Sequence, residues 1–562
     1  MAEKLTPQQL QAVTDRGGKL LVSAAAGSGK TKVLVDRLLS YLTDPVNPAN
    51  MDDFLIITYT KMAAAELRGK IASKLSEQIA ANPGNRHLQQ QMQRLYLAKI
   101  STVHAFCADL LRDYAYQLDI SGDFRVAEEN ECLELQLRVM EKILDEAYEN
   151  ASNDPDFCAL VDSQGFGRDD RQIPDIILKV YNSAKCHLCP DSWLDWCLSV
   201  NDASTMCDAS ETIWGRYLID DLHQYLNLHI HAFEQCILLA DQTGGMEKPA
   251  MLLRQTVSQL QKLTMYSRWD DIIVNMNIDY GRLIIPKECA QTQLAEQIKA
   301  VRDACKKGVA KKLRRFSDNS SQILSDIHKS APAVRGLVAL TRKFSEDYDR
   351  LKKDKHILDF GDLEHKTLDL LTGKNRADAT AIAREVGLRY REVMVDEYQD
   401  SNAVQDAIFS AITHQRQNCF MVGDVKQSIY QFRLADPGIF LDKYNDFVHA
   451  DEAIAGCGRK VVLSNNFRSS GAIIDAVNDV FSKCMTPQVG GLTYGADEAL
   501  HAGIPHIALN EPEIELHGIA VSEDTYEEEA SFVAQTVAQL LDGTHMVRQG
   551  ESLRPIVPGD VV

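Results

Sequence analysis

The stretch Ala24-Ala25-Ala26-Gly27-Ser28-Gly29-Lys30-Thr31 lies between an apolar run at residues 19–22 and a helical pattern at residues 33–39. A small-residue loop between a strand and a helix presents backbone N–H groups and a helix N-terminus to phosphates. In such a loop the lysine can reach the β- and γ-phosphates, and the hydroxyl that follows can bind Mg²⁺. The usual first glycine is replaced by Ala24. The whole stretch, residues 24–31, therefore predicts a nucleoside-triphosphate site with Lys30 in catalysis and Thr31 on the metal.

A second stretch, Val395-Asp396-Glu397-Tyr398-Gln399-Asp400, follows an apolar strand pattern at residues 392–395. Paired with a phosphate loop, such carboxylates have defined tasks: Asp396 is expected to hold Mg²⁺ and Glu397 to activate water. The alternative is a solvated acidic turn, which the pairing with the loop disfavours. The two stretches together predict ATP and Mg²⁺ as cofactors.

Composition is that of an ordinary globular protein of several domains, with 562 residues, 45% hydrophobic and 25% charged. The formal net charge of −20 argues against a wholly basic nucleic-acid surface but leaves room for a local basic groove. The densest basic stretch, residues 306–315, is better explained by a solvated helix face than by a DNA contact. No apolar run approaches the roughly 20 residues of a membrane span, and the N-terminus lacks an apolar signal segment. We expect a cytoplasmic protein without a membrane partner.

Thirteen cysteines are scattered along the chain, which suits reduced thiols in a cytosol. Cys186, Cys189, Cys197 and Cys207 lie close together in the sequence. Four thiols could hold zinc or an iron–sulfur cluster, but only one pair has ligand spacing. Buried or incidental thiols are the favoured interpretation, and a metal is the alternative.

The pattern of strands and helices divides the chain into three parts. Residues 1–125 and 350–455 alternate apolar strands with helices, which predicts an α/β lobe with a parallel sheet. Residues 126–349 carry long amphipathic stretches instead and predict a helical insertion that splits this lobe. A strand pattern at residues 460–463 is expected to open a second lobe, residues 456–562.

Further residues fit an ATP site. A glutamine amide at Gln9 could pair with the N6 donor and N7 acceptor of adenine. Gln427 follows a strand and a Gly-Asp turn, where it could sense the γ-phosphate. Arg468 would act as an arginine finger from the second lobe, and Phe467 beside it could stack on adenine.

Polar and aromatic side chains also follow the C-terminal ends of the expected strands, where an open α/β sheet places its ligands. Hydroxyls and cations there suit phosphate contacts, and aromatic rings suit base stacking. Ordinary strand-end chemistry, or a core position for the last two aromatics, is the alternative. The expected DNA-binding residues are Thr58, Tyr59, Thr60, Lys61, Thr102, His104, Tyr430 and Phe432.

Taken in order, these motifs resemble the superfamily 1A DNA helicases of the UvrD type. The resemblance rests on Gln9, AAAGSGKT (24–31), ITYTK (57–61), STVHAF (101–106), VDEYQD (395–400), VGDVKQSIYQFR (422–433) and NNFRS (465–469). Further stretches, such as LDFGDLE (358–364), resemble AddA, the helicase–nuclease component of AddAB complexes. Lys61 departs from the asparagine common in relatives, which leaves its DNA-phosphate role open.

The resemblance implies a RecA-like ATP-binding lobe, a second RecA-like lobe and 3′→5′ translocation on single-stranded DNA. It also implies action on double-strand break ends in recombinational repair, with DNA and an AddB-like protein as partners. No segment after Arg468 resembles the late helicase motifs or a nuclease domain, so the chain is expected to be an N-terminal piece with weak or no activity of its own. The alternatives are a stand-alone UvrD-type repair helicase and a non-catalytic fragment that binds nucleotide or DNA.

Overall fold

The computed structural model describes residues 5–118, 120–164, 171–376, 378–414, 417–429, 435–454, 456–506, 512–519, 526–550 and 552–562. The chain divides into two compact units. One unit joins Met1–Glu128 to Lys355–Val562, and the other is Glu129–Asp354. The ATP-binding motifs all belong to the first unit.

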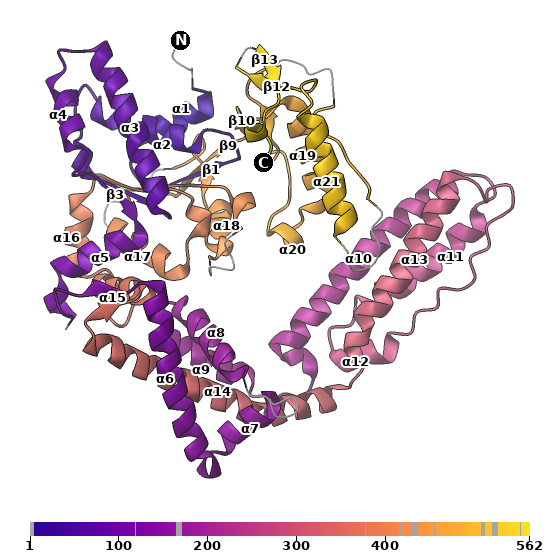
Figure 1. Cartoon of the computed structure of the whole chain (residues 1–562). Helices are drawn as coiled ribbons and strands as arrows, with labels where there is room; N and C mark the ends of the chain where they lie inside the picture. The colour runs from indigo at the N-terminus through magenta and orange to yellow at the C-terminus, as the bar shows by residue number, and fades with distance from the viewer. Residues whose placement is uncertain are drawn as a thin grey trace. The chain divides into compact units, whose positions relative to one another are not determined.

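The first unit is built on a parallel sheet of seven described strands in the order β3-β2-β6-β7-β1-β9-β8 (Figure 1). The central strands are buried along their whole length, as expected for a parallel sheet covered on both faces. This arrangement confirms the predicted α/β fold class. The strands are β1 (Leu20–Ala24), β2 (Phe54–Thr58), β3 (Lys99–Thr102), β6 (Glu392–Val395), β7 (Cys419–Gly423), β8 (Val448–His449) and β9 (Arg459–Leu463).

Alternation along the strands divides the core between the two faces of the sheet. Leu55 and Ile57 pack into the hydrophobic cluster that includes α5, α15, α16, α17 and α18, whereas Ile56 packs into the cluster of α1–α4. Figure 1 shows these two groups of helices on opposite sides of the sheet. The helices are α1 (Pro7–Thr14), α2 (Lys30–Leu42), α3 (Lys61–Ala81), α4 (Arg86–Arg94), α5 (Val103–Asp113), α15 (Phe360–Thr372), α16 (Ala381–Arg389), α17 (Ala403–Thr413) and α18 (Pro437–Asp446).

The strand at Arg459–Leu463 corrects one prediction. It was expected to open a second lobe, but β9 pairs with β1 and belongs to the first sheet, with Val22 opposite Val461. Val461 and Leu463 are buried in the same core as β1, and the pairing satisfies backbone groups that β1 would otherwise leave exposed at an edge. Any boundary of a second lobe therefore lies after this strand.

The chain then leaves the sheet through small elements. β10 (Asn465–Asn466) pairs with β11 (His501–Ala502), and β12 (Met546–Gln549) pairs with β13 (Ser552–Pro555). A separate short pair, β4 (Arg125–Val126) and β5 (Ile357–Leu358), brings together the two ends of the first unit where the helical unit is inserted. The helices of this part are α19 (Gly471–Cys484), α20 (Pro487–Gly490) and α21 (Glu527–Leu540).

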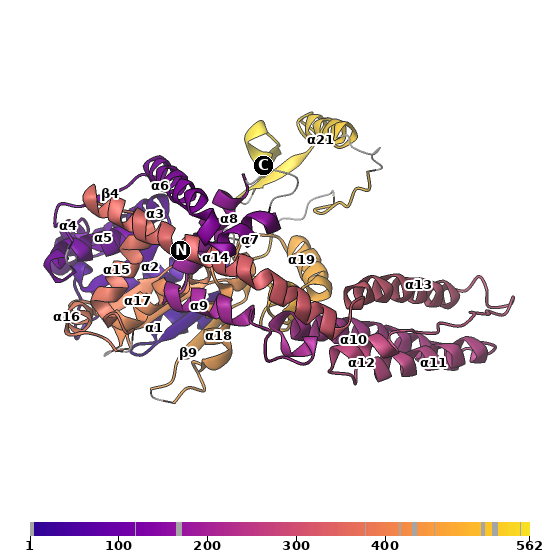
Figure 2. The ribbon, with the colours of Figure 1, turned by 90° about the horizontal axis from the view of Figure 1, so that it is seen from below.

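The second unit is helical throughout its described residues. Helices α10, α11 and α13 lie side by side around a core of their own (Figures 1 and 2). No helix in the described part of the chain is both long and apolar enough to cross a membrane. The helices are α6 (Glu129–Glu149), α7 (Pro155–Gln164), α8 (Ile173–Lys185), α9 (Pro190–Val200), α10 (Ile213–Asp241), α11 (Glu247–Leu263), α12 (Trp269–Asn275), α13 (Gln293–Leu313) and α14 (Ser320–Asp354).

Candidate nucleotide site and DNA-facing edge

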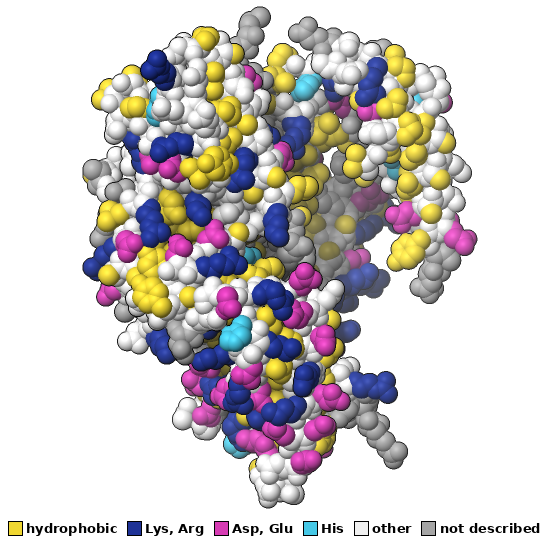
Figure 3. Space-filling model, turned by 60° about the vertical axis from the view of Figure 1, so that its left-hand side comes forward, with side chains coloured by type: hydrophobic (Ala, Val, Ile, Leu, Met, Phe, Trp, Pro, Cys, Tyr) yellow, Lys and Arg dark blue, Asp and Glu magenta, His cyan; other side chains and the backbone are white. Residues whose placement is uncertain are grey.

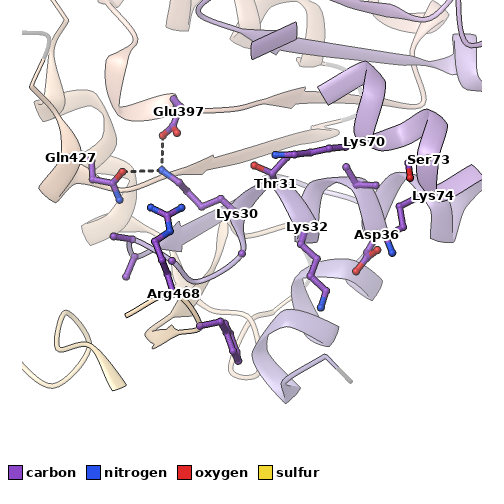
Figure 4. A pocket seen from close by; sticks show the side chains of 16 residues that line it. Lys30, Thr31, Lys32, Asp36, Lys70, Ser73, Lys74, Glu397, Gln427 and Arg468 are labelled. Atoms are coloured by element: carbon purple, nitrogen blue, oxygen red, sulfur yellow. Dashed lines mark hydrogen bonds and ion pairs between the residues drawn. The ribbon is translucent and has the colours of Figure 1, made fainter. Parts of the chain in front are cut away.

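A pocket of about 660 Å³ lies at the C-terminal end of β1, where α2 begins (Figure 4). This is the edge at which parallel α/β sheets bind ligands. Its lining comes from the phosphate loop, from α2 and α3, from the loops after β6 and β7, and from the segment after β10. The lining residues are Ala25, Ala26, Gly27, Gly29, Lys30, Thr31, Lys32, Val35, Asp36, Lys70, Ser73, Lys74, Glu397, Gln427, Phe467 and Arg468.

The phosphate loop has the backbone conformation that its glycines permit. Gly27 and Gly29 have φ angles of 69° and 86°, in the left-handed region that side chains disfavour. A Cβ at Gly27 would lie 2.7 Å from the side-chain oxygen of Asn466, so the loop also needs glycine there for space. Ala24 ends β1, where an alanine fits as well as a glycine would. The unusual first residue therefore does not disturb the loop.

Three of the four predicted catalytic side chains make direct contact. The Lys30 Nζ donates to Glu397 Oε2 at 2.6 Å and to Gln427 Oε1 at 3.4 Å. Arg468 points into the same pocket from the segment after β10 (Figure 4). The structure thus brings together residues that lie more than 360 positions apart in the sequence.

The carboxylates beside Lys30 form a site that suits a divalent cation. Burial raises the pKa of Asp396 to about 6, and the charge of Glu397 adds to the shift. The pKa of Asp400 is also raised to about 6, for the same two reasons. Asp400 Oδ1 is buried without a hydrogen-bond partner among the described residues. A hard cation bound by oxygen ligands would relieve this crowding of negative charge, so Mg²⁺ fits Asp396 with the Thr31 hydroxyl at the pocket wall.

The sequence profile of the UvrD/REP helicase N-terminal domain matches residues 5–448. The chain belongs to the UvrD/REP helicase family. The matched range holds the phosphate loop, the Asp396–Glu397 pair and Gln427, so the pocket is built largely from family segments.

Curated relatives of the AddA type, each named as an ATP-dependent helicase/nuclease subunit, extend the similarity beyond that range. The protein from Pelotomaculum thermopropionicum is 36% identical over 91% of this chain and 41% of its own length. Its counterpart from Desulforamulus reducens is 37% identical over 89% of this chain and 41% of its own length. For that of Clostridium novyi the values are 32%, 96% and 45%. The chain therefore spans about two fifths of the length of these relatives.

Gln9 occupies a different position from the one expected of an adenine-reading residue. It is only 3% exposed, and its Nε2 donates to the Ser28 carbonyl oxygen at 2.9 Å. Its Oε1 accepts from the backbone N–H of Thr6 at 3.1 Å, in the capping box of α1. In this helicase-family lobe Gln9 thus braces the phosphate loop against α1. Phe467, the expected adenine-stacking ring, does line the pocket.

Asn466 is a site residue to which the motif analysis gave no role. Its Nδ2 donates to the Ala26 carbonyl oxygen at 2.9 Å, and its Oδ1 accepts from the backbone N–H groups of Arg468 and Ser469, each at 2.8 Å. The side chain is buried, with 4% of the residue exposed. It therefore fixes the Arg468 segment to the phosphate loop. The repeated Asn-Asn before Phe467 was the available signal, but an asparagine in a loop has many other uses.

At the ends of β2 and β3, the predicted DNA-binding hydroxyls have structural roles. Thr60 and Thr102 cap α3 and α5 by accepting from the backbone N–H groups three residues on. Thr58 is buried and donates to the Thr60 carbonyl oxygen. Lys61 is exposed at the start of α3. Tyr430 and Phe432 lie outside the described residues.

His104 and Tyr59 are held at the same edge by a polar network. The His104 ring stacks on Phe360 with centroids 4.3 Å apart, and Phe360 is 55% exposed. Phe360 was quoted only as part of a resemblance, yet it adds an aromatic surface next to His104. The Tyr59 hydroxyl bonds to Ser401 and, at 3.3 Å, to Gln405 Oε1. These side chains lie on segments that follow β2, β3 and β6, which run parallel and end at one edge of the sheet.

Two features of the helical unit bear on the remaining predictions. Lys312 Nζ bonds to both carboxylate oxygens of Asp221 at 2.6 Å, and Arg315 lies 3.4 Å from the same group. Part of the basic stretch is therefore neutralised within the unit. Where Figure 3 shows α6, α7 and α14, Lys and Arg likewise alternate with Asp and Glu. Among the described residues no set of three or more His, Cys, Asp or Glu is placed to hold a metal ion, and the four clustered cysteines are free thiols.

Proposed function

We propose that this chain is the ATP-binding part of an ATP-dependent DNA helicase, which hydrolyses ATP and uses the energy to move along single-stranded DNA. The single observation that carries the proposal is the convergence of Lys30, Glu397, Gln427 and Arg468 on one pocket. A site that only holds nucleotide needs the phosphate loop. Hydrolysis in addition needs a water-activating base and a cation opposite the γ-phosphate, and both groups line this pocket.

The residues divide the work of phosphoryl transfer. The N–H groups of Gly27–Thr31 and the Lys30 ammonium would hold the β- and γ-phosphates. Bound Mg²⁺ would supply charge neutralisation of the phosphates, held by Asp396 and Thr31. Glu397 would accept a proton from the attacking water, and Gln399 Nε2 orients it by donating to Glu397 Oε2 at 2.9 Å. Gln427 and Arg468 would contact the γ-phosphate, where Arg468 stabilises the charge that develops on it.

We further propose that single-stranded DNA crosses the strand-end edge that carries Tyr59, Lys61, His104 and Phe360. Aromatic rings there would stack on bases, as the exposed Phe360 and its stacked neighbour His104 allow. Tyr430 and Phe432 belong to the same proposal through their place in the sequence. Thr58, Thr60 and Thr102 would shape the edge through their caps.

The names of the relatives support the biological setting. Proteins named as the ATP-dependent helicase/nuclease of the AddA type match about 90% of this chain. We propose on that basis 3′→5′ movement, action at double-strand break ends in recombinational repair, an AddB-like partner protein and a cytoplasmic location.

The test is steady-state ATP hydrolysis with and without single-stranded DNA, alongside binding of a fluorescent ATP analogue. Lys30→Ala should abolish hydrolysis, since the ammonium that holds the terminal phosphates is lost. The control is Lys99→Ala, which removes an exposed lysine paired with Asp109 on the edge strand and should leave hydrolysis unchanged. Hydrolysis that persists in Lys30→Ala would refute the assignment. Nucleotide binding by the wild-type chain without turnover would favour a non-catalytic nucleotide-binding role instead.

A further inference from the structure

Glu364, on α15, is a buried carboxylate with three side-chain hydrogen bonds. Only 6% of the residue is exposed. Its Oε1 accepts from Gln405 Nε2 at 2.7 Å and lies 3.0 Å from His104 Nε2, and its Oε2 accepts from Asn402 Nδ2 at 3.1 Å. A buried carboxylate is stable only when its oxygens are well paired, so these contacts define its position closely.

The partners of Glu364 come from two functional regions. His104 belongs to the edge proposed to contact DNA, one residue into α5 after β3 ends. Asn402 and Gln405 lie at the start of α17, directly after the loop that begins with Asp396 and Glu397. Glu364 therefore touches both the DNA-facing edge and the segment that follows the water-activating residue.

A second connection runs parallel to this one. Gln405 donates to Glu364 through Nε2 and accepts from the Tyr59 hydroxyl through Oε1. The same hydroxyl bonds to Ser401, which is fully buried. Tyr59, after β2, and His104, after β3, are thus both tied to the four residues Ser401–Val404 and to Gln405 next to them.

The loop between Glu397 and these residues is short and internally bonded. It forms a tight 3₁₀ turn at Tyr398–Asp400, in which Asp400 N–H donates to the Glu397 carbonyl oxygen and Ser401 N–H to that of Tyr398. Glu397 has a left-handed backbone (φ 48°), which a non-glycine residue keeps only when its surroundings hold it. A shift of Ser401 or Asn402 is therefore passed on to the Glu397 backbone rather than absorbed.

The charge state of Glu364 is set by the same contacts. Burial alone would raise its pKa, but the hydrogen bond and charge of His104 and the two amide donors hold the pKa below its usual value. Within the described part of the chain, His104 is the cationic side chain in ion-pair range of Glu364. Any movement of His104 when a base stacks beside it thus acts directly on a buried charge.

We propose that Glu364 is a positioning residue that couples DNA contact at the strand-end edge to the orientation of the Glu397 loop. DNA that moves Tyr59 or His104 would shift Asn402 and Gln405 through the carboxylate and so adjust Glu397 toward its working position. This proposal rests on the proposed function, because it assumes that DNA binds at this edge and that Glu397 activates water.

The experiment compares Glu364→Gln with the wild-type chain. The amide has nearly the shape of the carboxylate, but one acceptor oxygen becomes an NH₂ donor that would face another donor. We expect the ratio of DNA-stimulated to DNA-independent ATP hydrolysis to fall about tenfold or more. The affinity for a fluorescent ATP analogue should change by no more than about twofold, because Glu364 does not line the pocket. The matched control is Glu385→Gln, an exposed carboxylate on α16 that bonds to Tyr114.

Tyr59→Phe provides a second variant if Glu364→Gln does not fold, as judged by circular dichroism. It keeps the ring for stacking but removes both hydroxyl bonds, so DNA should still bind while stimulation falls. Stimulation equal to wild type in a folded Glu364→Gln, or in Tyr59→Phe if the first variant is unfolded, would overturn the coupling role alone. A wild-type chain that hydrolyses ATP without any response to DNA would overturn the proposed function and the coupling role together.

Discussion

Replacing Asn466 by alanine should separate nucleotide binding from hydrolysis. The side chain makes three hydrogen bonds, one to the Ala26 carbonyl oxygen and two from the N–H groups of Arg468 and Ser469. Each such bond is worth about 1 kcal/mol net, so Asn466→Ala removes roughly 3 kcal/mol that holds the Arg468 segment to the phosphate loop.

The loss should appear chiefly in turnover. An arginine finger contributes ~10³–10⁵ to the rate when it is accurately placed. Since about 1.4 kcal/mol corresponds to a factor of ten, a local loss of roughly 3 kcal/mol predicts a fall in kcat of about a hundredfold. The phosphate loop keeps Lys30 and its backbone donors. Nucleotide affinity should therefore weaken by about tenfold at most.

The assay pairs steady-state ATP hydrolysis with direct binding of a fluorescent ATP analogue. Asn465→Ala is the matched control: the residue precedes Asn466 in β10, and its side chain makes no hydrogen bond within the described structure. Arg468→Ala sets the size of the full effect. A kcat for Asn466→Ala within twofold of wild type would refute the positioning argument. An equal loss in binding and turnover would show that Asn466 supports the loop alone.

Three other perturbations have defined outcomes. Arg37→Met should lower the free energy of unfolding by about 3–5 kcal/mol in urea titrations, because it strands the buried Glu392 carboxylate; Arg37→Met/Glu392→Leu should recover much of it. Gly27→Ala should weaken nucleotide binding, because the methyl group meets Asn466 and φ is 69°. The lowered pKa of Glu364 means that its carboxylate stabilises the fold above its unfolded-state pKa and loses this contribution as pH falls through the folded value. The stability gap between wild type and Glu364→Gln should therefore be widest near neutral pH and narrow below about pH 4 in thermal melts.

The sequence by itself determined the parts of this protein that depend on contiguous residues. A phosphate loop is specified by glycines at left-handed positions and by a strand and helix on either side, all within residues 19–39. The Asp396–Glu397 pair is likewise announced by its own strand. Alternation of strand and helix patterns was enough to predict the α/β class, because each crossover leaves a local hydrophobic signature.

Only the tertiary structure decided which distant residues serve the same site. Arg459–Leu463 has the composition of a buried strand in either lobe, and pairing with β1 settled which sheet it joins. The amide of Gln9 could reach a base or a loop carbonyl, and the packing of α1 against the loop chose the carbonyl. Glu364 and His104 are 260 positions apart, and they meet because the parallel strands end at one edge beneath α15. Side-chain contacts of this kind depend on strand order and packing, which no local pattern of residues encodes.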